Sequence, residues 1–385
     1  MTLTIGSLFA GYGGLDLGIG QVLDAEPAWF CEWDEAPSKI LAHHWPDVPN
    51  FRDVTTVDWS AIPPVDIITG GSPCQDLSLA GARRGMTDGT RSNLWVAMRE
   101  AIATIRPRLV VWENVRGALS ATATSESDME PGEGLLGGGT GHLRALGRVL
   151  GDLATIGYDA RWALVRASDV GAPHHRARVF LVAYPADTGS VGLQAARRGS
   201  GPAASLAGPV GGAGTLPALN HLPTPNASDG TGGGQVPDKR TGHSRQLIDA
   251  VLDLGGQPYL QTPAVSDGNG GKSTKHVGGT RPSGTKRSVG LTDVPVLTAG
   301  DSVFGKYEPV VHRWEHATGM ESPVPTELNK NGRPRLNAAF AEFMMGLPPG
   351  WVTQVPGVTR AQQLKACGNG VVPQQAAAAL RHLLE

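Results

Sequence analysis

The order of apolar segments between residues 3 and 184 is the feature that most restricts how this chain can fold. Short runs rich in β-branched and aromatic residues alternate there with longer stretches of helical periodicity. The predicted strands are Thr4–Phe9, Ala28–Glu32, Val65–Thr69, Leu109–Glu113, Asp159–Val165 and Val179–Ala183, and the predicted helices are Leu15–Leu23, Glu35–His44, Leu94–Arg106 and His142–Ile156. This alternation predicts an α/β domain with a largely parallel sheet, in which ligands bind beyond the carboxyl ends of the strands.

The middle of the chain has a different character. Residues 188–300 hold 23 of the 53 glycines, and their ten basic and six acidic residues give a local charge of +4 in a chain of net charge −2. Leu222–Gly234 resembles Leu260–Lys272, and basic residues follow each copy. This region is either a flexible linker with a chance duplication or a loop-rich module that brings backbone and basic groups to a phosphate chain. Residues 118–141 read as an insertion.

Regular structure is predicted again near the C-terminus, with helices over Leu336–Met345 and Gln374–Leu384 and a loop at Gly368–Gly370. No apolar stretch is long enough to span a bilayer, and the first residues do not resemble a signal peptide. Three cysteines cannot make a disulfide framework, which favours a reducing, cytoplasmic setting.

The segment Ser7–Gly14, Ser-Leu-Phe-Ala-Gly-Tyr-Gly-Gly, ends the first predicted strand and opens a helix. Glycines in such a turn let the backbone approach a nucleotide-like ligand. The pattern Phe-x-Gly-x-Gly-Gly differs from the Gly-x-Gly-x-x-Gly of dinucleotide enzymes, which disfavours hydride transfer. Glu32 and Trp33 end the second strand, where a carboxylate can accept hydrogen bonds from a ribose and an indole can cover adenine. These residues indicate an adenosine-containing cofactor.

Cys74 stands in Gly-Ser-Pro-Cys-Gln, directly after an apolar strand. A cysteine at such a position can be a thiolate nucleophile, although an isolated cysteine is more often a small core residue. The polar loop 76–93 follows, with glycine pivots and with Arg83, Arg84 and Arg91. This composition is typical of a lid that closes over a polyanion.

Two further motifs place charged groups at strand ends. Burial of Glu113 in Trp-Glu-Asn-Val would raise the pKa of its carboxyl and favour a hydrogen-bond-donating form; otherwise this residue caps the next helix. In His-His-Arg-Ala-Arg, strand alternation puts His174, Arg176 and Arg178 on one face, where two guanidiniums can fix a carboxylate or bind an oxyanion. The adjacent histidines point apart and have no partner at ligand spacing, so we predict no metal site.

The four motifs follow one another between residues 7 and 178, and Gly-Asn-Gly-Val-Val stands near the C-terminus. Their order and spacing closely resemble the DNA cytosine-5 methyltransferase family, in its prokaryotic or phage form, over residues 3–184 and 333–384. The resemblance implies a class I S-adenosylmethionine-dependent methyltransferase fold: a Rossmann-like, mostly parallel sheet with an antiparallel hairpin. It also implies three segments: a catalytic domain (1–187), a small loop-rich target recognition domain (188–332), and a C-terminal segment (333–385) whose helix returns beside the first motif.

The resemblance assigns roles to individual residues. S-adenosylmethionine would be the cofactor, held by Phe9, Gly11, Gly13, Gly14, Glu32, Trp33, Asp53, Val54, Pro73, Leu94, Asn369 and Val371. Cys74 would be the nucleophile, with Gln75, Glu113, Asn114, Arg176 and Arg178 completing the catalytic site. Double-stranded DNA would contact Arg83, Arg84, Arg91, Lys239, Arg240, Arg245, Lys275, Arg281, Lys286 and Arg287.

The implied reaction begins with attack of Cys74 on carbon 6 of a flipped-out cytosine. Carbon 5 then becomes enamine-like and takes the methyl group, while Glu113 at N3 and Arg178 at O2 stabilise the ring charge. His174, where the family often has Gln, and Gly370, where it often has Ser, depart from the pattern without touching the nucleophile.

Three alternatives remain open. The same motifs suit an RNA (tRNA) cytosine-5 methyltransferase, although the long Gly/Pro-rich middle region favours duplex DNA. A non-catalytic DNA-binding descendant is disfavoured because Cys74, Glu113 and Arg178 are intact. An amino-methyltransferase would need Asn/Asp-Pro-Pro-aromatic where Ser-Pro-Cys-Gln stands. We expect a monomer without membrane contact; a cognate restriction endonuclease and the recognised DNA sequence are left open.

Overall fold

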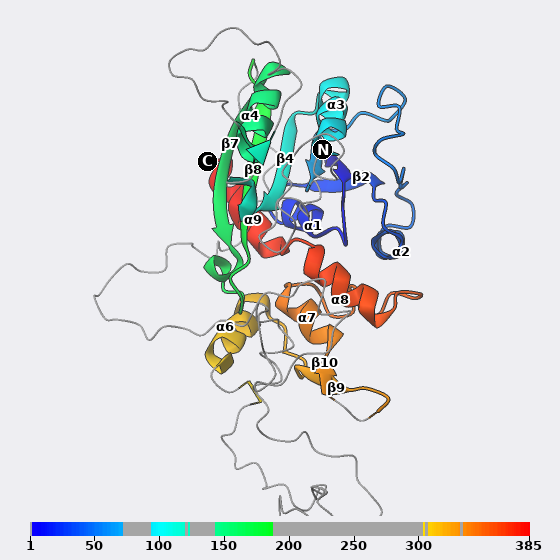
Figure 1. The fold of residues 1–385 in the computed structure, drawn as a ribbon, viewed down its shortest axis with the longest axis vertical. Coiled ribbons are helices and arrows are strands. Elements are labelled where there is room, and N and C mark those ends of the chain that lie inside the picture. The colour runs from blue at the N-terminus through cyan, green and yellow to red at the C-terminus, as the bar shows by residue number, and fades with distance from the viewer. Residues whose placement is uncertain are drawn as a thin grey trace, which may run out of the picture.

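The computed structural model of this chain describes residues 2–71, 94–119, 122–123, 143–187, 303–304, 307–331 and 334–385. Its centre is a six-stranded sheet of order β2-β1-β3-β4-β8-β7 (Figure 1). The strands are β1 (Leu3–Leu8), β2 (Ala25–Cys31), β3 (Ile67–Gly70), β4 (Leu109–Val115), β7 (Tyr158–Arg166) and β8 (Ala177–Pro185). The first four are parallel, and β8 runs antiparallel to both β4 and β7. The predicted mostly parallel sheet with an antiparallel hairpin is confirmed.

One strand boundary differs from prediction in a way that matters for the site. The strand predicted to end at Glu113 continues to Val115, because β8 keeps pairing with it. Glu113 therefore lies opposite Phe180 inside a paired strand rather than at a free strand end.

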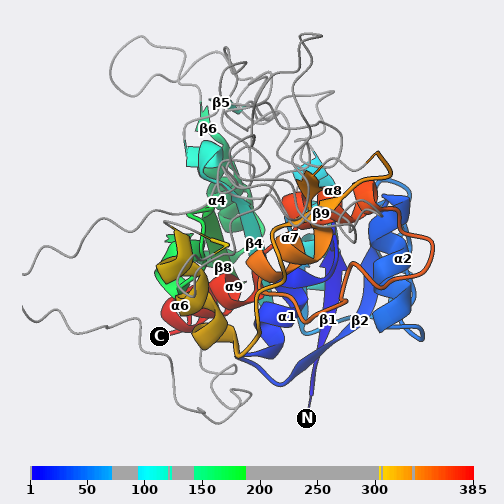
Figure 2. The same ribbon diagram turned by 90° about the horizontal axis from the view of Figure 1, so that it is seen from below.

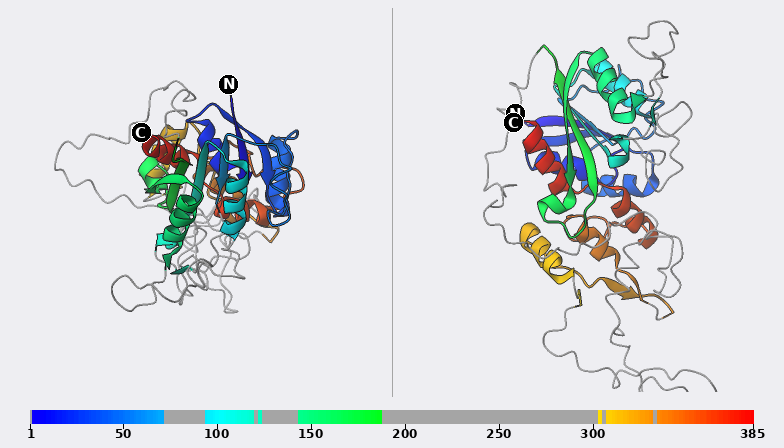
Figure 3. Two further views of the ribbon diagram at one scale, coloured as in Figure 1. Left: turned by 90° about the horizontal axis from the view of Figure 1, so that it is seen from above. Right: turned by 60° about the vertical axis from the view of Figure 1, so that its left-hand side comes forward.

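Helices cover both faces of the sheet, as an apolar sheet requires (Figure 3). The helices α3 (Trp95–Ile105) and α4 (Ala145–Thr155) cover one face, and α1 (Gly14–Gly20) and α9 (Pro373–Leu383) cover the other. The helix α2 (Glu35–His44) has its predicted bounds. Short elements complete this part: 3₁₀ turns at Arg116–Leu119 and Ala167–Val170, and the strand pair β5 (Thr122–Ala123) and β6 (Leu143–Arg144).

A third apolar cluster lies beyond the carboxyl ends of the parallel strands. It contains α6 (Glu308–Thr318), α7 (Ala338–Met344) and α8 (Arg360–Asn369), which lie across that end of the sheet (Figure 2). The indole Nε1 of Trp314 on α6 donates to the Phe343 carbonyl of α7, 2.8 Å away. The antiparallel pair β9 (Thr326–Leu328) and β10 (Pro334–Leu336) adjoins these helices.

The domain boundary predicted between residues 332 and 333 stays a prediction, and both residues lie outside the described ranges. The C-terminal part differs from prediction at the end of α8. The predicted Gly368–Gly370 loop is wrong for its first two residues, because Gly368 and Asn369 form the last turn of α8. In the part of the chain that the structure describes, no helix has the length and apolarity needed to cross a lipid bilayer.

Candidate functional site

The described residues of the first three motifs lie along one edge of the sheet. The register places Cys31, Leu8 and Gly70, the last residues of three parallel strands, in one row with Trp112 of β4. The residues that follow them, Glu32, Phe9, Gly71 and Glu113, therefore lie along the carboxyl edge. β1 lies between β2 and β3 in the sheet, so the chain crosses from β1 to β2 on one side and then returns past β1 to β3 on the other side. Open α/β sheets bind ligands at such a switch point.

The glycine-rich loop after β1 is fixed to the end of β2 through Glu32. Gly11 and Gly13 adopt left-handed φ angles of 57° and 82°, which glycine tolerates without strain. The Gly11 N–H donates to Glu32 Oε2 at 2.8 Å, and the Asp34 N–H donates to Glu32 Oε1 at 2.9 Å. Burial raises the pKa of Glu32, and these two N–H groups oppose that shift. The predicted cofactor residues Gly11 and Glu32 are thus in direct contact.

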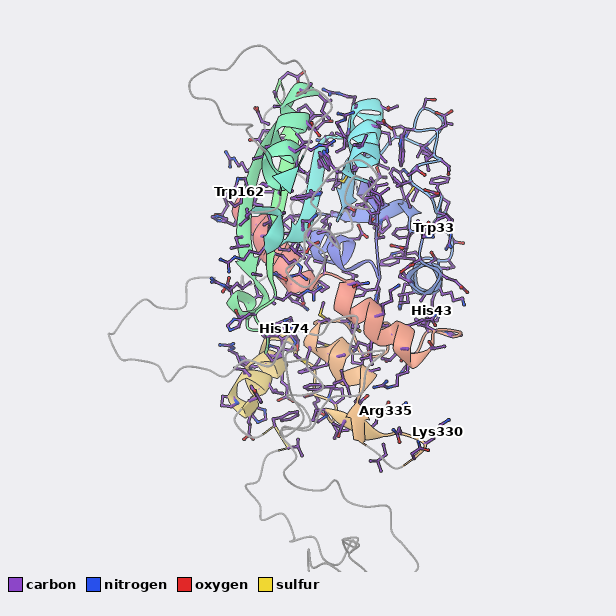
Figure 4. The ribbon with its side chains drawn as sticks, in the orientation of Figure 1. Trp33, His43, Trp162, His174, Lys330 and Arg335 are labelled. Carbon is purple, nitrogen blue, oxygen red and sulfur yellow. The ribbon has the colours of Figure 1, made fainter. Side chains whose placement is uncertain are left out.

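Trp33 lies next to this carboxylate at the molecular surface, with 66% of the residue exposed (Figure 4). Its carbonyl accepts a hydrogen bond of 2.8 Å from Arg52 Nη2. The Asn50 side-chain oxygen accepts from the Glu32 N–H at 2.9 Å. These contacts place Asp53, which follows Arg52 directly, beside the Glu32–Trp33 turn.

Asn50 and Arg52 were not predicted, since a polar side chain that binds a backbone group 18 or 19 residues away leaves no periodic signal. The Asp53 carboxylate accepts from the N–H and the hydroxyl of Thr55, and these hydrogen bonds lower its pKa. The predicted pocket residues Phe9, Val54 and Leu94 pack in or against one apolar cluster on the α3 side of the sheet.

Glu113 and Arg178 form the ion pair of the site. Arg178 Nε lies 3.0 Å from Glu113 Oε1, and the two side chains are 17% and 11% exposed. Burial raises the pKa of Glu113, while the charges of Arg178 and Arg176 oppose the shift. A methyl group added at Gly71 would come within 3.0 Å of Glu113 Oε2. The chain therefore passes this carboxyl closely just before the Pro-Cys-Gln motif.

The prediction that His174, Arg176 and Arg178 share one face is wrong. β8 begins only at Ala177, and Arg176 has a φ of 33°, so strand alternation does not extend back to it. The Arg176 guanidinium donates to the carbonyls of Gly368 and Gly370 instead. His174 Nε2 forms a hydrogen bond of 2.9 Å with the Met344 carbonyl at the end of α7, so this side chain lies between the start of β8 and α7 (Figure 4). Arg178 forms the ion pair with the Glu113 carboxylate.

Three further predicted site residues are described by the structure: Asn114, Asn369 and Val371. Asn114 is buried in β4, and its side-chain oxygen accepts from the Val115 N–H. Asn369 is exposed at the end of α8, and the Val371 carbonyl accepts from the hydroxyl of Tyr12, between Gly11 and Gly13. The remaining predictions lie outside the described residues: Pro73, Cys74, Gln75, Arg83, Arg84, Arg91, Lys239, Arg240, Arg245, Lys275, Arg281, Lys286 and Arg287.

The two cysteines that the structure describes, Cys31 and Cys367, are both buried. Burial raises the pKa of the Cys31 thiol to about 12 and also raises that of Cys367. Neither thiol is a nucleophile near neutral pH, because the reactive form is the thiolate. Within the described ranges, no group of three or more His, Cys, Asp or Glu side chains is arranged to hold a metal ion.

The strand order, the glycine-rich turn after β1 and the acidic residue after β2 together define a class I S-adenosylmethionine-dependent methyltransferase fold. Within that class, a more specific assignment follows from the sequence as a whole. The chain belongs to the C-5 cytosine-specific DNA methylase family, whose model matches residues 3–385.

Individual relatives are similar over less than half of this chain. The "DNA N-6-adenine-methyltransferase" of Escherichia phage P1 is 30% identical over 200 residues, which cover 42% of this chain and 26% of that protein. The "Type II methyltransferase M1.ScrFI" of Lactococcus lactis subsp. cremoris is 30% identical over 177 residues, 46% of this chain and 40% of that protein. The chain thus spans less than half the length of these two relatives.

A phage protein and a solved structure extend the comparison. The "Orphan methyltransferase M.Rho11sI" of Bacillus phage rho11s is 27% identical over 188 residues, 48% of this chain and 33% of that protein. The crystal structure of the S. pombe Dnmt2 methyltransferase matches with a TM-score of 0.50 at 13% identity, covering 99% of this chain and 98% of that one. This structural similarity concerns the fold alone.

Proposed function

We propose that this chain is a sequence-specific DNA cytosine-5 methyltransferase that uses S-adenosylmethionine. The observation that carries the proposal is the largely buried Glu113–Arg178 pair at the carboxyl edge of the sheet, where the backbone at Gly71, three residues before Cys74, passes close to Glu113. The family membership supports the same reaction.

The residues around the glycine-rich loop fit the proposed cofactor. Each Glu32 oxygen accepts one backbone hydrogen bond, which leaves acceptor capacity on the carboxylate for ribose hydroxyls. The exposed indole of Trp33 offers a face to adenine, and Phe9, Val54 and Leu94 supply apolar contacts. When bound there, S-adenosylmethionine supplies an electrophilic methyl group.

The protein's own groups then account for the activation of cytosine. Cys74 adds to carbon 6 as a thiolate, which makes carbon 5 nucleophilic. Glu113, whose burial favours its protonated form, donates a hydrogen bond to N3, and Arg178 stabilises the charge that develops at O2. Carbon 5 would take the methyl group with release of S-adenosylhomocysteine and would then lose its proton to water, so that the sulfur leaves by β-elimination and the free thiolate is restored.

The relatives support DNA as the substrate, since the family is one of DNA methylases and two of the similar proteins come from phages. The basic, glycine-rich region between residues 188 and 300 is consistent with a polyanionic partner. We infer that the enzyme acts in the cytoplasm of a bacterial or phage-infected cell.

Bisulfite sequencing of DNA from cells that express the chain tests the reaction and reports the recognised sequence together. We expect one methylated cytosine per recognised site with the wild-type chain, none with Cys74→Ala, and unchanged methylation with the Cys31→Ala control. Methylated adenine instead of methylated cytosine, detected by mass spectrometry of nucleosides from the same DNA, would overturn the proposed chemistry. Methylation of tRNA but not of duplex DNA, assayed in parallel, would replace the proposed substrate with RNA.

A further inference from the structure

Gly370, directly after α8, is a glycine that the backbone conformation does not require. Its φ of −77° and ψ of 178° belong to the extended region that any residue adopts. A Cβ atom at this position would nevertheless lie 1.9 Å from Cε1 and 2.2 Å from Cζ of Tyr12. The ring of Tyr12 therefore occupies the space in which a side chain at position 370 would stand.

Tyr12 is completely buried and is held by the C-terminal segment at both of its ends. Its hydroxyl donates to the Val371 carbonyl at 2.8 Å. Its own carbonyl accepts from the indole Nε1 of Trp351 at 3.0 Å. Because Tyr12 lies between Gly11 and Gly13, these contacts fix the centre of the loop that borders the proposed cofactor site.

The same C-terminal backbone also contacts the residues that lead into β8. The Arg176 guanidinium donates to the Gly370 carbonyl, and the Gln375 side-chain amide donates to the Arg176 carbonyl at 2.8 Å. Arg178, two residues further on, holds Glu113. One continuous set of contacts thus joins the loop at Tyr12 to the ion pair proposed to bind the base.

We propose that Tyr12 is a positioning residue, matched in size to Gly370, that sets the glycine-rich loop relative to the Glu113–Arg178 pair. The proposal rests on the proposed function, because the loop would hold the methyl donor and the ion pair would hold the acceptor base. A shift of the loop would weaken binding of the donor and misalign it with the base, without removing any group that touches either.

The test is a double-mutant cycle on the full chain with Tyr12→Ala, Gly370→Ala and the combined variant, using calorimetric binding of S-adenosylmethionine and kcat on DNA. Gly370→Ala should weaken binding about tenfold or more in the wild-type background, because the new methyl group collides with the ring. In the Tyr12→Ala background the same change should cost less than about twofold. Gly151→Ala, at a position with open space around the added methyl group, is the control for the substitution itself.

A milder pair of variants decides the question if the larger changes prevent folding. Tyr12→Phe removes only the hydroxyl and should raise KM for S-adenosylmethionine about fivefold. Tyr158→Phe removes a matched group, since the buried Tyr158 hydroxyl donates to the Pro107 carbonyl at the same distance of 2.8 Å. Tyr158→Phe should lower thermal stability as much as Tyr12→Phe does and leave the KM for S-adenosylmethionine unchanged.

Each outcome separates this proposal from the proposed function. Fully additive effects of Tyr12→Ala and Gly370→Ala, or equal KM changes in Tyr12→Phe and Tyr158→Phe, would overturn the positioning role while methyl transfer stands. A wild-type chain that binds no S-adenosylmethionine would overturn the proposed function and this proposal with it. A Gly370→Ala chain that folds only in the Tyr12→Ala background would support the size match.

Discussion

Arg178 reaches Glu113 diagonally across the one antiparallel pairing that β4 makes, with 3.0 Å between Nε and Oε1. Glu113 stands opposite Phe180, so Arg178 comes from two residues along the neighbouring strand and on the same face. Burial favours the neutral carboxyl and the guanidinium favours the charged one, and the net effect is a raised pKa. A carboxyl with these two opposing influences on its pKa can donate a hydrogen bond to a cytosine ring in its protonated form and can also exist in its charged form.

Replacement of Glu113 by Gln tests that role. The amide keeps the shape but cannot exchange a proton, so we expect kcat for methyl transfer to fall about a hundredfold. Binding of S-adenosylmethionine should stay unchanged, because the proposed cofactor contacts lie at Glu32 and Trp33. Single-turnover methylation of DNA measures the effect. Glu35→Gln, at an exposed carboxyl on α2, is the control, and full activity of Glu113→Gln would contradict the assignment.

Arg178→Ala tests the energetics of the same pair. Loss of the guanidinium leaves a buried carboxylate uncompensated, which typically costs about 3–5 kcal/mol of unfolding free energy. The raised pKa of Glu113 implies that this cost shrinks as the pH falls and the carboxyl takes a proton. Adding Glu113→Gln should therefore recover stability at pH 8. Urea unfolding of the single and double variants measures this, and equal stabilities at pH 8 would show that the carboxylate is well solvated.

Asp16 on α1 should give the protein a measurable pH dependence of stability. Its carboxylate accepts from Ser7 and Thr69, but burial dominates and raises its pKa from 3.8 to about 6. The folded state therefore binds more protons than the unfolded state between these values, so this group's contribution to stability is lost as the pH rises from about 4 to about 6.

Asp16→Asn removes this dependence because the amide does not titrate. Relative to the wild-type chain, we expect the variant to gain up to about 3 kcal/mol between pH 4 and pH 7. Chemical unfolding at several pH values measures the difference. Asp58→Asn, at an exposed carboxyl whose pKa is lowered by Ser60, should not gain stability over that range. If the difference in unfolding free energy between Asp16→Asn and the wild-type chain does not change with pH, the raised pKa of Asp16 is contradicted.

Trp33→Ala tests the proposed adenine contact. Loss of a stacking surface typically costs about 1–3 kcal/mol, so the Kd for S-adenosylmethionine should rise about tenfold or more. Trp162→Ala on the edge strand β7 is the matched control, since Trp162 is 45% exposed and belongs to no predicted site. Calorimetry compares the two variants. Equal affinities would place the adenine elsewhere.

Hydrophobic periodicity predicted the helices and strands whose apolar residues repeat regularly over a short stretch of sequence. The helix Glu35–His44 has its predicted bounds, and all six strands of the central sheet were found within three residues of the expected positions. The helix α6 was missed, because Pro309 and the glycine-rich sequence before it read as irregular; proline is in fact tolerated in a first helical turn. The mostly polar α8 has little apolar periodicity and was missed for that reason.

For the site, residues beside apolar strands could be singled out from the sequence, and residues defined by long-range contacts could not. Glu113 was singled out because it follows a buried apolar run and Arg178 because it precedes one, and the resemblance to a family supplied their roles. Arg176 was misplaced, because its φ of 33° reverses the direction expected from strand alternation. Tyr12 gave no signal, because its partners Trp351 and Val371 are more than 300 residues away in the sequence.

The packing of α9 against α1 bears on how the molecule is assembled. Until residues 373–383 are available, Ile5, Ile67 and Val111 lack part of the layer that shields them from water. A nascent polypeptide on the ribosome would hold this surface open until α9 is synthesised, and such surfaces bind chaperones or other unfinished chains. Refolding in vitro should be correspondingly slow, because contacts such as that between Arg381 and Gln21 form across 360 residues of sequence.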